Sequence, residues 1–212
     1  MSSGHGGPSS INITERKLMA KLADQLSQCQ ECHFSTKEVE CLLHHYRFLL
    51  PHQERMDRTT FRDVLNREFK MTEDILMDRI FRAFDKDNDS HISMEEWILG
   101  LSVFLKGEQD EKIKFAFTVY DLNGDNYISK EEVFHLLKHC LVKSSTEEDR
   151  DESIRELMEL AMKKMDGDHD NRLSYSDYLD GVHKEPLLIE AFGPCLPPDD
   201  LAQNFLASCV ET

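Results

Sequence analysis

The chain has 212 residues, with 41 acidic and 25 basic side chains and a formal net charge of −16 at pH 7. This length is enough for one large domain or two small lobes, each with its own core. An acidic chain of this kind argues against nucleic acid and anionic lipid as main partners, because both require a basic surface. No apolar run approaches the about 18 residues of a membrane span. Position 2 is Ser2 rather than the glycine that N-myristoylation needs, so we expect no membrane anchor.

The first residues are rich in glycine and serine, and we expect a disordered N-terminus over residues 1–13. They contain no apolar core and no basic leader, so we expect a cytoplasmic chain whose six cysteines are reduced thiols. The string Cys29-Gln-Glu-Cys-His33 matches a haem attachment motif or half of a zinc site. No second CxxC is present to complete a zinc site, and we interpret these cysteines as structural.

Three amphipathic stretches follow in the first third of the chain. Apolar residues at helical spacing predict a helix over residues 14–28. Ser35 and Glu38 have the spacing of a capping box, which predicts that a second helix begins there. A third apolar face, over residues 61–69, is closed by Lys70.

From residue 85 onward, three twelve-residue stretches share one pattern, at 85–96, 121–132 and 166–177. Each has an acid at position 1, Asp or Asn at positions 3 and 5, an aliphatic residue at 8, serine at 9 and an acid at 12. This is the pattern of the EF-hand calcium loop, in which side-chain oxygens and the backbone carbonyl of position 7 surround the ion. We number them the second, third and fourth loops, because a first loop without ligands precedes them.

The expected metal ligands occupy positions 1, 3, 5, 7 and 12 of each loop. In chain order they are Asp85, Asp87, Asp89, His91, Glu96, Asp121, Asn123, Asp125, Tyr127, Glu132, Asp166, Asp168, Asp170, Arg172 and Asp177. The residues at position 7 contribute only their carbonyl oxygens, so the side chains of His91 and Arg172 are expected to face solvent.

The loops differ at two positions that affect ion binding. Position 12 of the fourth loop is Asp177, one methylene shorter than the glutamate that reaches Ca²⁺ with both oxygens. Position 6 usually requires glycine because its φ is positive, but here it is Ser90, Asn126 and Asn171 in turn. We therefore expect up to three Ca²⁺ ions, with the fourth loop the weakest or least selective and open to Mg²⁺.

The first loop is predicted from the repeat spacing. Asp121 lies 36 residues after Asp85, and the same step back from Asp85 reaches Leu49, so the first loop spans residues 49–60. Its positions 1, 3, 5 and 12 hold no carboxylate, so this EF-hand is degenerate. EF-hands pair through a short ladder at position 8, which predicts two backbone pairs. These pairs are Met56 with Ile92, and Ile128 with Leu173.

The predicted fold is all-α, with two paired EF-hand lobes, four hands of which the first is degenerate, an extra N-terminal helix and a short C-terminal helix. The N-terminal lobe covers 14–106, the C-terminal lobe 107–184, and a C-terminal helix and tail 185–212. Residues 143–152 are polar and acidic, and we expect a mobile linker there. A short helix with Pro186 in its first turn is expected to end at Gly193, and Pro197–Pro198 disfavours its continuation.

Methionine and phenylalanine residues lie at helical spacings beside the loops. Most must be core, but some of them would line a groove that opens when calcium binds. No nucleophile triad or nucleotide-binding loop is present, so we expect no enzymatic activity.

Three longer strings, Met71–Asp89, Trp97–Leu105 and Leu188–Pro197, resemble the calaxin family. These are EF-hand proteins of ciliary and flagellar axonemes, related to the neuronal calcium sensors, and the likeness extends over residues 17–197. The resemblance implies a Ca²⁺ sensor in the axonemal cytoskeleton. It would bind the heavy chain of outer-arm dynein, with tubulin or the docking complex as further partners, and regulate motility and waveform. Two alternatives remain: a regulatory subunit or sensor for another target, such as a phosphatase or kinase, or a Ca²⁺ buffer.

Overall fold

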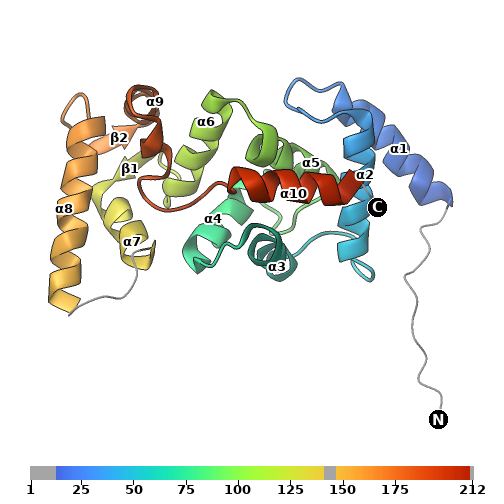
Figure 1. Cartoon of the computed structure of the whole chain (residues 1–212), viewed down its shortest axis with the longest axis horizontal. Coiled ribbons are helices and arrows are strands. Elements are labelled where there is room, and N and C mark those ends of the chain that lie inside the picture. The colour runs from blue at the N-terminus through green and yellow to red at the C-terminus, as the bar shows by residue number, and fades with distance from the viewer. Residues whose placement is uncertain (1–12, 141–146, 211–212) are drawn as a thin grey trace, which may run out of the picture.

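The computed structural model describes residues 13–140 and 147–210, so the N-terminus expected to be disordered lies almost wholly outside the described residues. The described part is mostly helical, which confirms the predicted all-α class (Figure 1). No helix in it is long and apolar enough to cross a membrane. The α-helices are α1 (Ile13–Ser27), α2 (Thr36–Leu49), α3 (Arg58–Phe69), α4 (Asp74–Phe84), α5 (Met94–Leu101), α6 (Gln109–Tyr120), α7 (Lys130–Cys140), α8 (Glu147–Met165), α9 (Tyr175–Lys184) and α10 (Asp199–Val210). A π-helix, η1 (Ser102–Lys106), follows α5, a 3₁₀-helix, η2 (Pro186–Glu190), follows α9, and two short strands are β1 (Tyr127–Ser129) and β2 (Arg172–Ser174).

The hands pair as the position-8 rule predicts. Met56 and Ile92 exchange two backbone hydrogen bonds, of 3.0 and 2.8 Å, and form an antiparallel bridge. Ile128 lies opposite Leu173 in the antiparallel pair of β1 and β2. The degenerate first loop therefore supports the second loop without contributing carboxylates at its ligand positions.

The hydroxyl of Tyr46 reinforces the first of these ladders. It donates a hydrogen bond to the carbonyl of Ile92 at 2.6 Å and accepts one from the amide of Met56 at 3.1 Å. Burial raises the pKa of Tyr46 to about 12, so the hydroxyl stays protonated and able to donate. Tyr46 thus links the degenerate first loop to the second loop.

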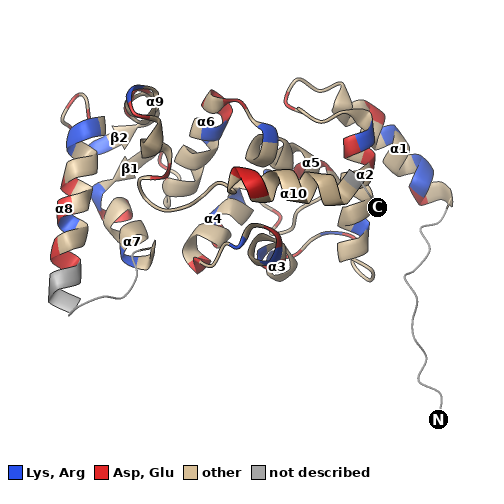
Figure 2. Ribbon diagram, viewed as in Figure 1, with Lys and Arg blue, Asp and Glu red and all other residues tan. Residues whose placement is uncertain are grey.

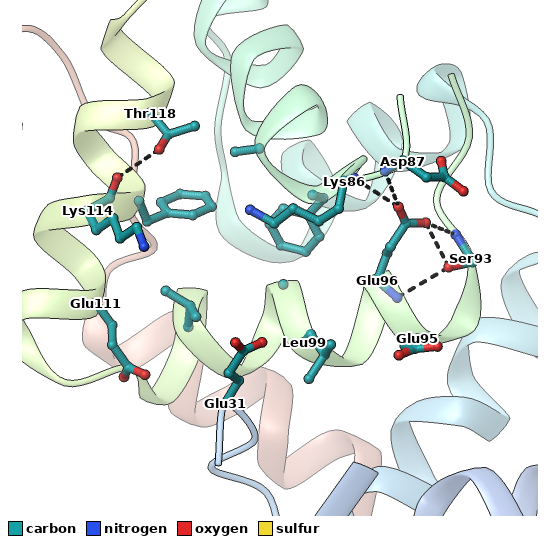
Figure 3. Close-up of a pocket in the computed structure, with 15 residues that line it drawn as sticks. Glu31, Lys86, Asp87, Ser93, Glu95, Glu96, Leu99, Glu111, Lys114 and Thr118 are labelled. Carbon is teal, nitrogen blue, oxygen red and sulfur yellow. Dashed lines mark hydrogen bonds between the residues drawn. The ribbon is translucent and has the colours of Figure 1, made fainter. Parts of the chain in front are cut away.

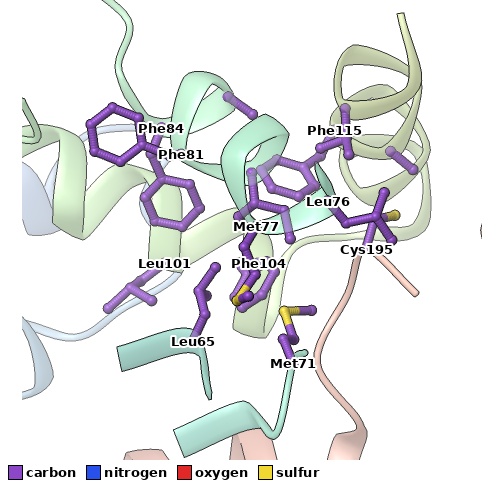
Figure 4. Packing of buried hydrophobic residues seen from close by; sticks show 14 of the residues in the cluster. Leu65, Met71, Leu76, Met77, Phe81, Phe84, Leu101, Phe104, Phe115 and Cys195 are labelled. Carbon is purple, nitrogen blue, oxygen red and sulfur yellow. The ribbon is translucent and has the colours of Figure 1, made fainter. Parts of the chain in front are cut away.

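A continuous aromatic core joins the two lobes. The ring of Phe84 at the end of α4 lies 5.0 Å from that of Phe61. It also lies 5.9 Å from the ring of Phe104, which in turn lies 5.7 Å from that of Phe115 on α6 (Figure 4). Such edge-to-face contacts add stability beyond area burial. Gly100 is required beside this row, because a Cβ there would lie 2.3 Å from the Phe84 ring. The two pairs of hands therefore pack through one shared core.

The expected linker over 143–152 is partly wrong. Residues 147–152 form the first turns of α8, while 143–146 lie outside the described residues. Among the residues of α8 whose side chains are described, Ile154 is the first that is buried. Apolar periodicity gives no signal for these turns, because residues 143–152 are all polar or charged.

The expectation of a short C-terminal helix followed by a tail is incomplete. The 3₁₀-helix η2 begins at Pro186 as expected, but α10 then begins after the two prolines. The carbonyl of Pro198 accepts a hydrogen bond from the amide of Ala202 at 2.9 Å, so the proline starts a new helix. Helix α10 packs on α2, α3 and η1 of the N-terminal lobe (Figure 1). Its Phe205 is buried, with ring centroids 5.2 Å from Phe69 and 5.3 Å from His45.

Candidate calcium sites

Each loop begins where its entering helix ends. The amides of Asp85, Asp121 and Asp166, at position 1, donate to the carbonyls four residues earlier at 2.9, 2.9 and 2.8 Å. The exiting helices α5, α7 and α9 begin at position 10 of the second, third and fourth loops. Ligand positions 1 to 7 of each loop therefore lie between two helices, and position 12 lies in the first turn of the exiting helix.

The carboxylate of position 1 organises each loop from within. In the second loop, Asp85 accepts from the amides of Asp89 at 3.1 Å and Ser90 at 3.0 Å. In the third loop, Asp121 accepts from the amides of Gly124 at 2.7 Å and Asn126 at 2.9 Å. These backbone contacts curl the chain so that the later ligands face the first one.

The curl requires left-handed backbone at two positions, not one. At position 6, φ is 68° for Ser90, 67° for Asn126 and 68° for Asn171, as expected for this position. At position 4, φ is also positive, at Asn88, Gly124 and His169, a second requirement that the loop pattern does not predict. Asparagine and glycine adopt this conformation at low cost, which explains their presence at four of these six positions.

Carboxylates converge in two of the loops. Asp85, Asp87 and Asp89 each place one oxygen within 4.8 Å of the others, and Asp166, Asp168 and Asp170 do the same. In the third loop an amide takes the middle position, and Asn123 Nδ2 donates to Asp125 at 3.0 Å. Burial raises the pKa of Asp85, and the nearby carboxylates of Glu96 and Asp87 raise it further. An all-oxygen cluster with this mutual repulsion fits a hard divalent cation such as Ca²⁺.

Position 12 closes the cage in the second and third loops. Glu96 and Glu132 are buried, and their carboxylates reach across to the amides of Lys86 at 2.8 Å and Asn123 at 3.0 Å. For Glu96, burial raises the pKa, but the hydrogen bonds from Ser93 and the loop amides outweigh it, and the net pKa is lowered. The ionised carboxylate of Glu96, which a cation needs as a ligand, is therefore favoured.

The fourth loop closes less tightly. Asp177 reaches the amide of Gly167, at position 2, only at 3.4 Å, whereas Glu96 reaches the position-2 amide of Lys86 at 2.8 Å; Asp177 keeps its contacts with Ser174. The shorter side chain thus leaves one carboxylate oxygen farther from the loop entrance than in the second loop.

We expect Asp177→Glu to raise the Ca²⁺ affinity of the fourth loop by about tenfold, equivalent to about 1.4 kcal/mol, because the longer arm offers both oxygens. Isothermal titration calorimetry of the full chain measures this change in affinity. The reciprocal change Glu132→Asp is the matched control and should weaken the third loop. Unchanged affinity in the fourth loop would show that arm length does not limit binding there.

Basic residues at position 7 lie against the carboxylates. Arg55, at position 7 of the degenerate first loop, forms an ion pair with Asp89 of the second loop and lies 3.9 Å from Asp87. Arg172 pairs with Asp170 at 2.8 Å and lies over the ring of Tyr127 at 3.8 Å. The predicted exposure of the His91 and Arg172 side chains is confirmed, with about half of each accessible.

Removal of the Arg55 charge should strengthen the second loop, because the guanidinium competes with the ion for Asp89. We expect Arg55→Gln to raise its Ca²⁺ affinity by about two- to fivefold, the range of an exposed ion pair. The same calorimetry at low and high salt measures this gain, which should shrink at high salt. Lys37→Gln, which removes an equal charge at an exposed residue near the start of α2, is the control.

A pocket borders the second loop. It has a volume of about 660 Å³ and lies between the loop, α5 and α6 (Figure 3). Its walls include the apolar side chains of Phe84, Leu99 and Phe115, and the acidic Glu96 of the loop itself. A movement of Glu96 on ion binding would therefore change the pocket wall.

Within residues 13–140 and 147–210, the clusters of His, Cys, Asp or Glu that could hold a metal lie in the second and fourth loops. On the face shown in Figure 2, Lys and Arg are interspersed with Asp and Glu along α8. His33, from the haem-like string, pairs with Glu111 at 2.6 Å, and Cys29 and Cys32 are free thiols. The string therefore serves the packing between the α1–α2 turn and α6.

Comparison with known proteins identifies EF-hands at the second, third and fourth loops. The description "EF hand" matches residues 76–101, and "EF-hand domain pair" matches 110–182. Calaxin of Xenopus laevis is 55% identical over 196 residues, 90% of this chain and 94% of the relative. Calaxin of Homo sapiens is 50% identical over 199 residues, 91% of this chain and 93% of the relative. Calcium and integrin-binding family member 2 of Danio rerio is 30% identical over 177 residues, 80% and 92% of the two chains. The chain therefore belongs to the calaxin family of EF-hand proteins.

Proposed function

We propose that this protein is a Ca²⁺ sensor that binds the heavy chain of axonemal outer-arm dynein in a calcium-dependent manner and regulates ciliary or flagellar motility. The observation that carries the proposal is the identity of 50–55% with calaxins over about 90% of the chain. The second, third and fourth loops hold the ions, through the fifteen ligand residues named from the sequence. The protein acts without catalysing a reaction.

Ion binding supplies the signal through charge. Three carboxylates within 4.8 Å of one another in the second and fourth loops repel each other until a divalent ion neutralises them. Because position 1 ends the entering helix and position 12 lies in the exiting helix, the ion pulls the two helices into a new relation. In sensors of this type, such a movement uncovers apolar surface for a target helix.

Two apolar surfaces support helix binding. The N-terminal lobe presents a face that α10 covers, where Phe205 is buried against Phe69. On the C-terminal lobe, Leu157 and Leu160 of α8 are about half exposed. An amphipathic helix from the dynein complex would bind one of these surfaces.

A calcium-dependent pulldown tests the partner. The full chain, immobilised, is incubated with axonemal extract in Ca²⁺ or in chelator, and retained proteins are identified by mass spectrometry. We expect the dynein heavy chain only with Ca²⁺, and no retention by the double variant Glu96→Gln/Glu132→Gln. Retention of a phosphatase or kinase instead, or of dynein without calcium, would refute the assignment.

Binding of a hydrophobic dye separates a sensor from a buffer. A sensor should show increased dye fluorescence on addition of Ca²⁺, because apolar surface becomes accessible. A buffer binds the ion with little change of shape, and its dye signal stays constant. The Glu96→Gln/Glu132→Gln variant gives the baseline.

A further inference from the structure

One arginine joins the two calcium lobes through the backbone. Arg79, on α4, extends its guanidinium to the C-terminal end of α6. Its Nε donates to the carbonyl of Val119 at 3.1 Å and its Nη1 to that of Leu122 at 3.1 Å. Its Nη2 donates to the carbonyl of Thr118 at 3.2 Å and also to that of Asp121. A single side chain of α4 thus donates to four carbonyl groups, two in the last turn of α6 and two in the first residues of the third loop.

The physical chemistry of a helix end makes this contact specific. The last carbonyls of an α-helix have no intrahelical partner and carry partial negative charge, so a cation with several donors suits them. The guanidinium is planar and rigid, and binding to four fixed acceptors therefore sets both the distance and the angle between α4 and α6. Burial lowers the pKa of Arg79, and Arg82 lowers it further, while Asp121 and Glu132 act in the opposite sense.

Both helices lead directly into calcium loops. Helix α4 ends at Phe84, directly before the first residue of the second loop, and α6 ends at Tyr120, directly before the first residue of the third loop. They pack against each other in the middle of the molecule (Figure 1), and the rings of Phe84 and Phe115 lie 6.1 Å apart. Because Arg79 binds the carbonyl of Asp121 itself, a shift of α4 displaces the entrance of the third loop.

We propose that Arg79 is a positioning residue that couples the second and third loops, so that filling the second loop raises the Ca²⁺ affinity of the third. The coupling runs from the ion at Asp85 through α4 and Arg79 to the backbone of Asp121. The inference rests on the proposed calcium binding by both loops. Under this inference the two lobes respond to Ca²⁺ together, and Arg79 is the side chain that couples them.

A double-mutant cycle tests the coupling. NMR titration of the full chain follows each loop by one amide: that of Ser90, which donates to Asp85 at 3.0 Å, and that of Asn126, which donates to Asp121 at 2.9 Å. Four proteins are compared: wild type, Glu96→Gln, Arg79→Gln and the double variant. We expect Glu96→Gln, which silences the second loop, to weaken the third loop by about fivefold or more, the usual scale of coupling between sites. In the Arg79→Gln background, the same change should leave the third loop unaffected.

Two further variants separate positioning from charge. Arg82→Gln removes an equal charge from the same helix, at an exposed residue, and should keep the coupling. Arg79→Lys keeps the charge but lacks the planar fork, and should lose most of the coupling. Thermal unfolding by circular dichroism confirms that each variant is folded, and Arg79→Lys carries the test if Arg79→Gln is not.

Each outcome has a clear meaning. Coupling that survives in Arg79→Gln or Arg79→Lys, even with reduced stability, overturns the inference, as does an equal loss in Arg82→Gln. The inference is also overturned if Glu96→Gln, with Arg79 in place, leaves the Ca²⁺ affinity of the third loop unchanged. If the amides of Ser90 and Asn126 in the wild type do not respond to Ca²⁺ at all, the proposed function fails instead.

Discussion

The Glu132→Gln substitution is expected to lower the Ca²⁺ affinity of the third loop by about 100-fold or more, equivalent to about 2.7 kcal/mol. Glu132 is buried at the start of α7, and its two oxygens accept hydrogen bonds from the amides of Asn123 at 3.0 Å and Ser129 at 2.8 Å. An amide in its place keeps the size but removes the charge and one of the two oxygens that reach the ion. Calorimetric titration of the full chain measures the loss.

The adjacent Glu131 provides the control for that experiment. It is exposed on the same helix, so Glu131→Gln changes the formal charge equally without altering the cage. Its effect on affinity should stay within about twofold, as for a screened surface charge. Equal losses in the two variants would mean that net charge, rather than the position-12 carboxylate, holds the ion.

The Trp97→Ala substitution should produce the largest loss of stability, about 3–5 kcal/mol, the range for deleting a large buried aromatic side chain. Trp97 is 1% exposed and lies directly after the position-12 glutamate of the second loop. Its ring centroid lies 6.2 Å from that of Tyr46, 6.3 Å from Phe61 and 6.5 Å from Phe84. The variant therefore removes the centre of the N-terminal core.

Guanidinium unfolding of the full chain measures the free energy of unfolding for this variant. Phe48→Ala, at a side chain that is 75% exposed, is the matched aromatic control and should change that free energy by less than about 0.5 kcal/mol. A loss of similar size in both variants would indicate a general effect of the sequence change rather than a cavity at Trp97.

The loops and their pairing could be predicted because ion chemistry dictates their residue types and spacing. A calcium cage needs oxygen donors at fixed intervals, and a paired ladder needs an aliphatic side chain at position 8. Even the first loop, which lacks its carboxylates, keeps Met56 at that position, and this was enough to place it opposite Ile92. The weaker closure by Asp177 also follows from counting methylene groups.

The remaining features depend on long-range contacts that local patterns do not encode. An arginine within a helix is ordinary, and nothing near Arg79 in the sequence shows that it binds carbonyls about 40 residues away. Arg55 is equally unremarkable until the ladder brings it to Asp89. The docking of α10 was missed because its apolar residues indicate a helix face but not the surface that receives it.

The row of aromatic rings that runs from Phe61 through Phe84 and Phe104 to Phe115 has a consequence for how the molecule comes apart. Cleavage of the chain near Gly107 and separation of the two lobes would expose a hydrophobic surface on each of them. The two lobes are therefore not independent domains. Heat or denaturant should unfold them together in a single cooperative transition.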